Sequence, residues 1–203
     1  GHQFGPGVSL ESAVPTPTGR GLTREIDVIS PTEPLLTAHD RNWEMIEAAL
    51  EGLDEATMAR QPTGQCNSIA WILWHMSRVV DTFVNTRLQS KPQLWVQDGW
   101  HQKFGMSNNP DDRGVGWTAQ QVAVWVAPPP EVQLGYYEAI KNSTREYLSP
   151  LTYADLEKRR VIPPVAEPRT VAAALGQMTW DNIAHGGQIA YLRGFYKGMG
   201  WYR

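Results

Sequence analysis

Residues 171–198 read "VAAALGQMTWDNIAHGGQIAYLRGFYKG", and this stretch decides the fold. Apolar residues recur along it at spacings of three and four, which predicts one long α-helix with an apolar stripe. Asp181 and His185 stand in the middle of that stripe. A carboxylate in an apolar stripe is costly unless it is paired or bound to a metal. The stretch therefore predicts a long packed helix with a polar site on its buried side.

Three further segments have helical periodicity, residues 30–53, 67–89 and 130–151. The second is apolar almost all round, because Trp71 and Trp74 lie opposite its main stripe, so we expect it at the centre of a bundle or against a partner subunit. Residues 90–117 lack periodicity and predict a long crossover loop. A T-x-x-Q capping box at Thr118 predicts a short extra helix. Strand-like alternation is scarce, so we expect an all-α fold: a four-helix bundle with a long crossover loop and short extra helices.

The composition is that of a soluble globular protein, with 41% hydrophobic and 19% charged residues among 203 and a net charge of −3. Residues 1–34 are rich in Gly, Pro, Ser and Thr and predict a mobile arm, and residues 35–203 predict one bundle domain. No basic footprint for nucleic acid and no membrane-spanning stretch is present in the sequence. The single cysteine, Cys66, excludes an internal disulfide and favours a cytoplasmic location.

The second helix offers a partner for the polar pair. His75 lies at the shoulder of its apolar stripe, so it reaches Asp181 and His185 if the two helices are neighbours. Two imidazoles and one carboxylate, with open positions left for water or substrate, suit a divalent metal such as Zn²⁺, Ni²⁺ or Fe²⁺. A buried polar cluster without metal is the alternative, in which Asp181 bonds His75 or pairs with Arg78 or Arg193.

Three motifs occur in order, "SIAWILWHMSRVVD" at 68–81, "LWVQDGWHQKFG" at 94–105 and "DNIAHGGQIAYLRG" at 181–194. Together they resemble the DinB/YfiT-like superfamily, in particular its actinobacterial branch of thiol-transferase-like proteins. The resemblance extends from about Leu35 to Lys197. It implies a four-helix bundle, commonly a homodimer, with a metal held by one histidine of the second helix and an H-x-x-x-H pair on the last. It also implies activities such as mycothiol-dependent maleylpyruvate isomerisation and S-transfer from low-molecular-weight thiols.

The match to this ligand pattern is partial. His75 and His185 stand at two of the expected positions, whereas Asp181 replaces the first histidine of the pair. Aspartate can ligate, but it is shorter than histidine and charged, so it favours a different metal or marks a site that has lost its metal. Gln188 follows His185 closely enough to fix the tautomer of its imidazole.

Three hypotheses follow for the function. The first is a metal-dependent enzyme that acts on a small-molecule substrate with a low-molecular-weight thiol as co-substrate. The second is a non-catalytic stress-related or interaction protein on the same bundle, with a polar cluster and no metal. The third is a binding protein for an apolar ligand under the aromatic loop, residues 95–117. His39 is expected to be a core or cavity-wall histidine, and His101 a residue that pins the loop.

Overall fold

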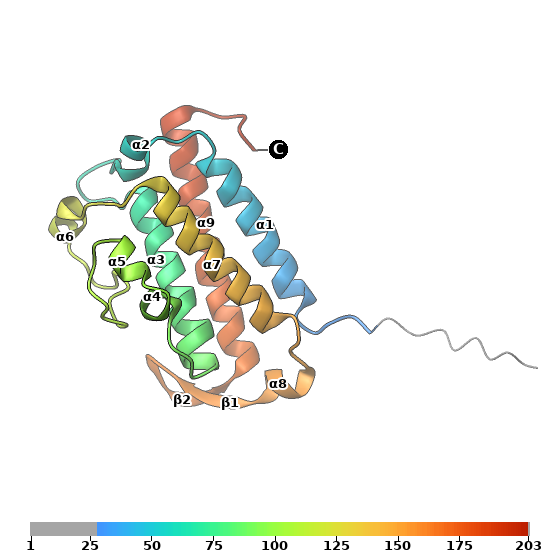
Figure 1. The fold of residues 1–203 in the computed structure, drawn as a ribbon. Coiled ribbons are helices and arrows are strands. Elements are labelled where there is room, and N and C mark those ends of the chain that lie inside the picture. Colours follow the sequence, from blue (N-terminus) through green and yellow to red (C-terminus); the bar gives the residue numbers. More distant parts are fainter. Residues whose placement is uncertain (1–27, 203) are drawn as a thin grey trace, which may run out of the picture.

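The computed structural model describes residues 28–202 and builds them into a bundle of four long helices (Figure 1). These are α1 (Glu33–Leu50), α3 (Ile69–Asp81), α7 (Pro130–Leu148) and α9 (Val171–Lys197). A π-helical segment, η1 (Thr82–Leu88), continues α3. The predicted all-α bundle is confirmed, and residues 1–27 of the predicted arm lie outside the described residues.

Side-chain caps place the starts of the helices that carry the polar residues. The Ser68 hydroxyl accepts from the Trp71 amide at 3.1 Å at the start of α3, and the Thr170 hydroxyl accepts from the Ala173 amide at 3.1 Å at the start of α9. Each cap satisfies one amide that has no partner inside its helix. The starting residue of each helix is thereby fixed, and with it the side that each later residue faces.

Helix α3 occupies the centre of the bundle, as its all-round apolar pattern predicts. It packs against α7 and α9, and α1 lies on the other side of α9 (Figure 1). Trp71 and Trp74 are 6% and 1% exposed, so the second side of α3 is covered by this chain itself. The cover is the crossover segment, residues 89–129 between η1 and α7, whose Trp117 and Trp125 lie within 5.5 Å of the Trp74 ring, centroid to centroid.

The crossover segment is anchored by a buried carboxylate. Asp81 accepts from the amides of Leu94 and Trp95 and from the Tyr136 hydroxyl. These bonds hold the first of the short helices that follow α3, which are α4 (Leu94–Gln97), α5 (Trp100–Lys103) and α6 (Ala119–Val124). The capping box predicted at Thr118 is present, with Gln121 as its second member. Two more short helices are α2 (Glu55–Ala59) and α8 (Tyr153–Glu157).

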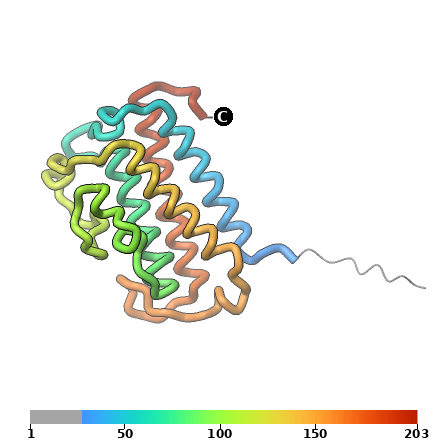
Figure 2. The backbone as a smooth tube through the Cα atoms, in the orientation of Figure 1, coloured from blue at the N-terminus to red at the C-terminus, as the bar shows by residue number. Residues whose placement is uncertain are grey.

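One element differs from the expected all-helical layout. An antiparallel hairpin of β1 (Arg159–Ile162) and β2 (Val165–Thr170) closes the end of the bundle from which α9 starts (Figure 2). Most residues of both strands are exposed, and Ile162 alone is buried. Because Ile162 is the one buried residue among these strands, their sequence lacks the alternation by which half-buried strands are detected. None of the helices between residues 28 and 202 is long and apolar enough to cross a membrane.

Candidate metal centre

The structure brings His75, Asp181 and His185 together where α3 packs on α9. The rings of His75 and His185 meet edge to face, with 4.9 Å between their centroids. His185 Nε2 lies 3.7 Å from Asp181 Oδ1 across one helical turn. The three residues that the sequence predicts as one cluster are therefore neighbours.

His75 is held on three sides. Its ring stacks on Trp71 at 4.8 Å and 10°, its edge meets His185, and its Nδ1 donates to the carbonyl oxygen of Arg113. Burial is the main cause that lowers the pKa of His75, and the neighbouring His185 lowers it further, while the Arg113 carbonyl and Asp181 oppose the shift. A neutral imidazole protonated at Nδ1 leaves Nε2 as the metal-binding atom.

The loop that supplies the Arg113 carbonyl is itself fixed from α3. Buried Arg78, one turn beyond His75, donates from Nε to the Asp112 carbonyl at 3.1 Å. The next residue, Gly114, has φ +81°, and a Cβ there would lie 2.6 Å from the Trp71 ring. A left-handed backbone in contact with an indole requires glycine. The loop can thus approach Trp71 and place the carbonyl on His75.

His185 has its own positioning partner. Its Nδ1 lies 2.8 Å from Gln188 Oε1, an oxygen that can only accept, so Nδ1 carries the proton and Nε2 is free to ligate. The side chains of Asp181 and His185 are 33% and 18% exposed. Solvent and small molecules therefore reach this side of the cluster.

The donor set fits a divalent cation in its chemistry. Two ligands held at about 2.0–2.1 Å from a tetrahedral zinc ion lie roughly 3.3 Å apart. The 3.7 Å between His185 Nε2 and Asp181 Oδ1 is within a few tenths of an ångström of that spacing. Across residues 28–202, however, no three His, Cys, Asp or Glu side chains are arranged so that they would hold a metal as they stand. A metal held by all three residues therefore requires their side chains to rearrange.

Neither Arg78 nor Arg193 forms an ion pair with Asp181 within residues 28–202, and Arg78 is engaged elsewhere. Arg78 NH1 donates to Gln93 Oε1 at 2.6 Å and lies 3.8 Å from Asp81. Its other nitrogens donate to loop carbonyls. Within the part of the chain that the structure describes, the side chain placed against the Asp181 carboxylate is His185, with 3.7 Å between Nε2 and Oδ1.

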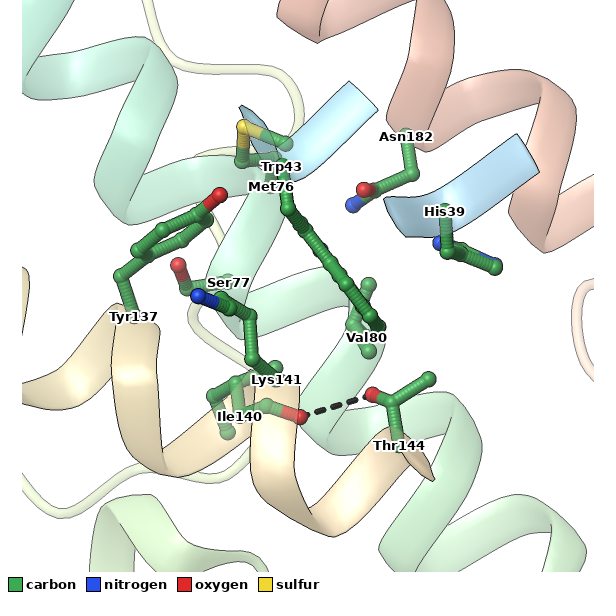
Figure 3. A pocket seen from close by; sticks show the side chains of 10 residues that line it. All are labelled: His39, Trp43, Met76, Ser77, Val80, Tyr137, Ile140, Lys141, Thr144 and Asn182. Carbon is green, nitrogen blue, oxygen red and sulfur yellow. Dashed lines mark hydrogen bonds between the residues drawn. The ribbon is translucent and has the colours of Figure 1, made fainter. Parts of the chain in front are cut away.

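His39 belongs to a separate polar cluster inside the bundle (Figure 3). It is fully buried, stacks on Trp43, and its Nε2 lies 3.0 Å from the Thr179 hydroxyl. It lines a cavity of about 10 Å³, enough for roughly one water, together with Tyr137 and Lys141. Burial lowers the pKa of His39 to about 4, against the raising effect of Asp40. The prediction of a cavity-wall histidine is confirmed.

The remaining reactive side chains lie outside the cluster. His101 Nδ1 donates to the Trp95 carbonyl at 2.9 Å, so it pins the crossover segment as expected. Cys66 is exposed and its sulfur lies 3.3 Å from the Thr63 hydroxyl, with no histidine bonded to it. Neither residue extends the site.

Sequence reasoning missed the Arg113 carbonyl. It is a backbone atom, so no side-chain pattern identifies it. The signal that was available is Gly114 in a loop rich in tryptophan, because glycine marks a place where backbone comes close to another group.

The comparison with known families concerns the fold that carries these residues. Residues 38–189, more than half of the chain, match the DinB superfamily. The chain belongs to the DinB superfamily. The matched region contains all four long helices in part or whole and includes His75, Asp181 and His185. DinB membership establishes the bundle that carries the cluster.

A solved structure shares this DinB bundle. The crystal structure of a conserved protein from Enterococcus faecalis superposes with a TM-score of 0.74 at 23% sequence identity, covering 85% of this chain and 100% of that one. At that identity the likeness shows the fold alone. No curated protein matches the chain by sequence.

Proposed function

We propose that this DinB-superfamily protein is a cytoplasmic, metal-dependent enzyme that binds a divalent cation through His75, Asp181 and His185. The observation that supports this most is the pair of tautomer-fixing bonds, from His75 Nδ1 to the Arg113 carbonyl and from His185 Nδ1 to Gln188. Metal-binding histidines usually donate their second N–H to such an oxygen. Two histidines in contact, each with that partner, favour a ligand role over a chance polar contact.

The proposed reaction is thiol-dependent S-transfer or isomerisation of a small molecule. A bound divalent cation lowers the pKa of a coordinating thiol, so that sulfur is available as thiolate at neutral pH. His75 stays neutral because of burial, which keeps its Nε2 available as a donor atom. Asp181 and His185 form the solvent-accessible side, through which co-substrates enter. In S-transfer the thiolate forms a carbon–sulfur bond while the leaving group of the electrophile departs with its electron pair. In isomerisation the thiolate adds to a double bond of the substrate, and the carbon–sulfur bond breaks again, re-forming the double bond, after the substrate has rearranged.

A second candidate is a DinB bundle that binds no metal and works as a non-catalytic interaction protein. The incomplete arrangement of ligands in residues 28–202 favours it, as does the 3.7 Å contact between His185 Nε2 and Asp181 Oδ1. In that case the cluster contributes only to stability, and Asp181→Ala changes the melting temperature without changing any turnover.

Elemental analysis separates the two. The full chain is purified without a metal column, alongside His185→Ala and a control, His101→Ala, which removes a histidine outside the cluster. The enzyme hypothesis expects close to one divalent metal per chain in the parent and the control, and a loss in His185→Ala. It also expects turnover of an electrophile by a low-molecular-weight thiol that disappears in the same variant. A parent that is free of metal, with a melting temperature unaffected by added Zn²⁺, Ni²⁺ or Fe²⁺, contradicts it.

A further inference from the structure

Three arginine side chains, from η1, the crossover segment and β2, lie close together. Burial is the main cause that lowers the pKa of Arg87, and the neighbouring guanidinium groups of Arg113 and Arg169 lower it further. Asp111 opposes the shift. The Arg87 guanidinium also lies over the ring of Phe83, with 4.9 Å between its central carbon and the ring centroid. We call this group the arginine cluster, defined by Arg87, Arg113 and Arg169.

No carboxylate of the described chain pairs with the arginine cluster. Among residues 28–202, no Asp or Glu oxygen lies within 4 Å of a guanidinium nitrogen of these three residues. Other arginines of the bundle do have such a partner, Asp81 for Arg78 and Asp40 for Arg145. Like charges that are held together repel each other, so the cluster is unfavourable unless an anion binds to it.

Arg169 has donor atoms for which the described chain supplies no acceptor. Its Nη1 donates to Gln177 Oε1 of α9, which fixes the guanidinium against that helix. Its Nε and Nη2 are buried and have no hydrogen-bond partner among residues 28–202. A buried donor without an acceptor is unfavourable, most of all on a charged group. Nε and one Nη of a guanidinium form the fork that binds two oxygens of one carboxylate or phosphate, so the unpaired atoms of Arg169 suit such an anion.

The hairpin adds a fourth arginine beside the cluster. Arg160 on β1 is the register partner of Arg169 on β2, so the two side chains leave the same face of the hairpin. Like charges directly opposite each other on paired strands are destabilising. Positive charge is thus concentrated at this end of the bundle although it lowers the stability of the hairpin, and a bound anion would offset that loss.

The arginine cluster borders the candidate metal centre. Arg113 belongs to both, because its carbonyl accepts from His75 Nδ1 while its guanidinium is part of the cluster. On α9, Gln177 holds Arg169 and lies one helical turn before Asp181. An anionic group held by the cluster is therefore bound next to the candidate metal.

We infer that the arginine cluster is a binding site for an oxyanion group, a carboxylate or a phosphate, of a small-molecule ligand. A small ligand fits better than a nucleic acid, because the arginines form one compact group on a chain with a net charge of −3. The inference goes beyond the proposed function, since binding by guanidinium groups requires no metal. Only the further step, that this ligand is a substrate, rests on the proposed enzyme.

Titration of the full chain with inorganic phosphate tests the site, with the melting temperature as the readout and sodium chloride of equal ionic strength as the reference. We expect a phosphate-specific rise with a Kd of about 1 mM or below. Arg87→Gln and Arg169→Gln should each weaken binding about tenfold, since each removes charge-assisted hydrogen bonds. Arg41→Gln is the matched control, because it removes the same charge from an exposed arginine of α1. An equal rise with chloride, or unchanged phosphate affinity in both cluster variants, overturns the inference.

Two further arms identify where the anion binds and what it is. His185→Ala removes a ligand of the candidate metal centre and should leave phosphate binding unchanged, so a failure of the proposed enzyme does not affect this result. Loss of phosphate binding in His185→Ala would place the anion on the metal centre and overturn the inference. Malonate is titrated in the same way, and tighter binding than that of phosphate indicates a carboxylate ligand, whereas weaker binding indicates a phosphate ester. Absence of a specific rise with either anion overturns the inference as well.

Discussion

The imidazole of His75 stands edge-on to the imidazole of His185, with 4.9 Å between the ring centroids, although the two residues come from different helices. Each ring is also fixed by a hydrogen bond at Nδ1, that of His75 to the Arg113 carbonyl and that of His185 to Gln188. In each ring Nδ1 donates its proton to an oxygen, so Nε2 keeps the lone pair that can bind a metal. The orientation of both rings is therefore set before any metal binds. This arrangement leads to predictions for the partners as well as for the ligands.

Gln188→Ala is expected to weaken metal binding by about tenfold, since the loss of an outer partner of a histidine ligand costs roughly 10–100-fold in affinity. The bond that is removed is the 2.8 Å contact between Gln188 Oε1 and His185 Nδ1. Competition with a chromophoric chelator measures the affinity. Gln177→Ala is the matched control, because Gln177 is exposed on the same helix and bonds Arg169 instead. Equal affinities in the two variants would remove Gln188 from the site.

Asp181→His restores the H-x-x-x-H pattern that the family resemblance implies. Imidazole is a softer ligand than carboxylate and suits Zn²⁺ and Ni²⁺. We expect at least tenfold tighter binding of these two ions than in the parent, measured by the same competition, and weaker binding in Asp181→Ala. If both substitutions leave affinity unchanged, Asp181 does not ligate and the site consists of the two histidines alone.

His39 is expected to make the protein sensitive to mild acid. Its folded-state pKa of about 4 lies below the ordinary 6.5, so the unfolded chain binds the proton first as pH falls. Stability is therefore full above pH 6.5 and is lost as pH falls toward 4. Between pH 7.5 and 4.5 this one group removes about 2–3 kcal/mol of unfolding free energy.

His39→Gln removes the titration and keeps a polar side chain opposite Thr179. Urea denaturation at the two pH values measures the difference, and the variant should lose about 2–3 kcal/mol less than the parent over this interval. An identical loss in both proteins would assign the acid sensitivity to other groups.

Much of this bundle is predictable from its sequence, because periodicity and caps are local. The four long helices and the capping box at Thr118 were predicted in this way and are present. The four-residue helices α4 and α5 were not, since one turn is too short to show a period of 3.6 residues. The β1–β2 hairpin was not predicted either, because its strands are exposed and lack an alternating pattern.

In the candidate site, too, the part that depends on one helix was predictable and the part that depends on tertiary structure was not. Asp181 and His185 are four residues apart on one helix, so their proximity follows from helical geometry. The contact of His75 with His185 depends on α3 and α9 being neighbours, and the crossover carbonyl on His75 depends on tertiary structure alone. For Trp71 and Trp74 the sequence left two alternatives, the centre of a bundle or a partner subunit, and the structure has them buried by the chain's own Trp117.

Two ion pairs with the same spacing should differ greatly in importance. Arg78 and Asp81 are both fully buried, whereas Arg41 and Glu44 are 69% and 59% exposed, and both pairs are i, i+3. Asp81→Ala leaves the buried Arg78 guanidinium without a nearby carboxylate and leaves two amides of α4 without an acceptor. We therefore expect the free energy of unfolding to fall by about 3–5 kcal/mol. Glu44→Ala should cost at most about 0.5 kcal/mol. Chemical denaturation measures both, and comparable costs would show that burial does not decide the value of the pair.

Adjacent glycines on α9 provide a test of how closely α1 and α9 approach. A Cβ at Gly186 would lie 2.0 Å from Asn42 Oδ1, and Asn42 cannot move freely because its amide donates to Asn182 at 3.2 Å. Gly186→Ala should therefore lower the unfolding free energy by about 1–3 kcal/mol through overpacking. Gly187→Ala, with nothing within 4 Å, should raise it by up to about 1 kcal/mol through helix propensity.

Both alanine variants are compared with the parent by chemical denaturation. Asn42→Ala shortens the obstructing side chain, so it should restore part of the stability that Gly186→Ala loses and should do nothing for Gly187→Ala. A double-mutant cycle isolates that coupling, since Asn42→Ala alone also loses the bonds to Asn182. If Gly186→Ala proves as stable as Gly187→Ala, the two helices are farther apart at this point than the structure shows.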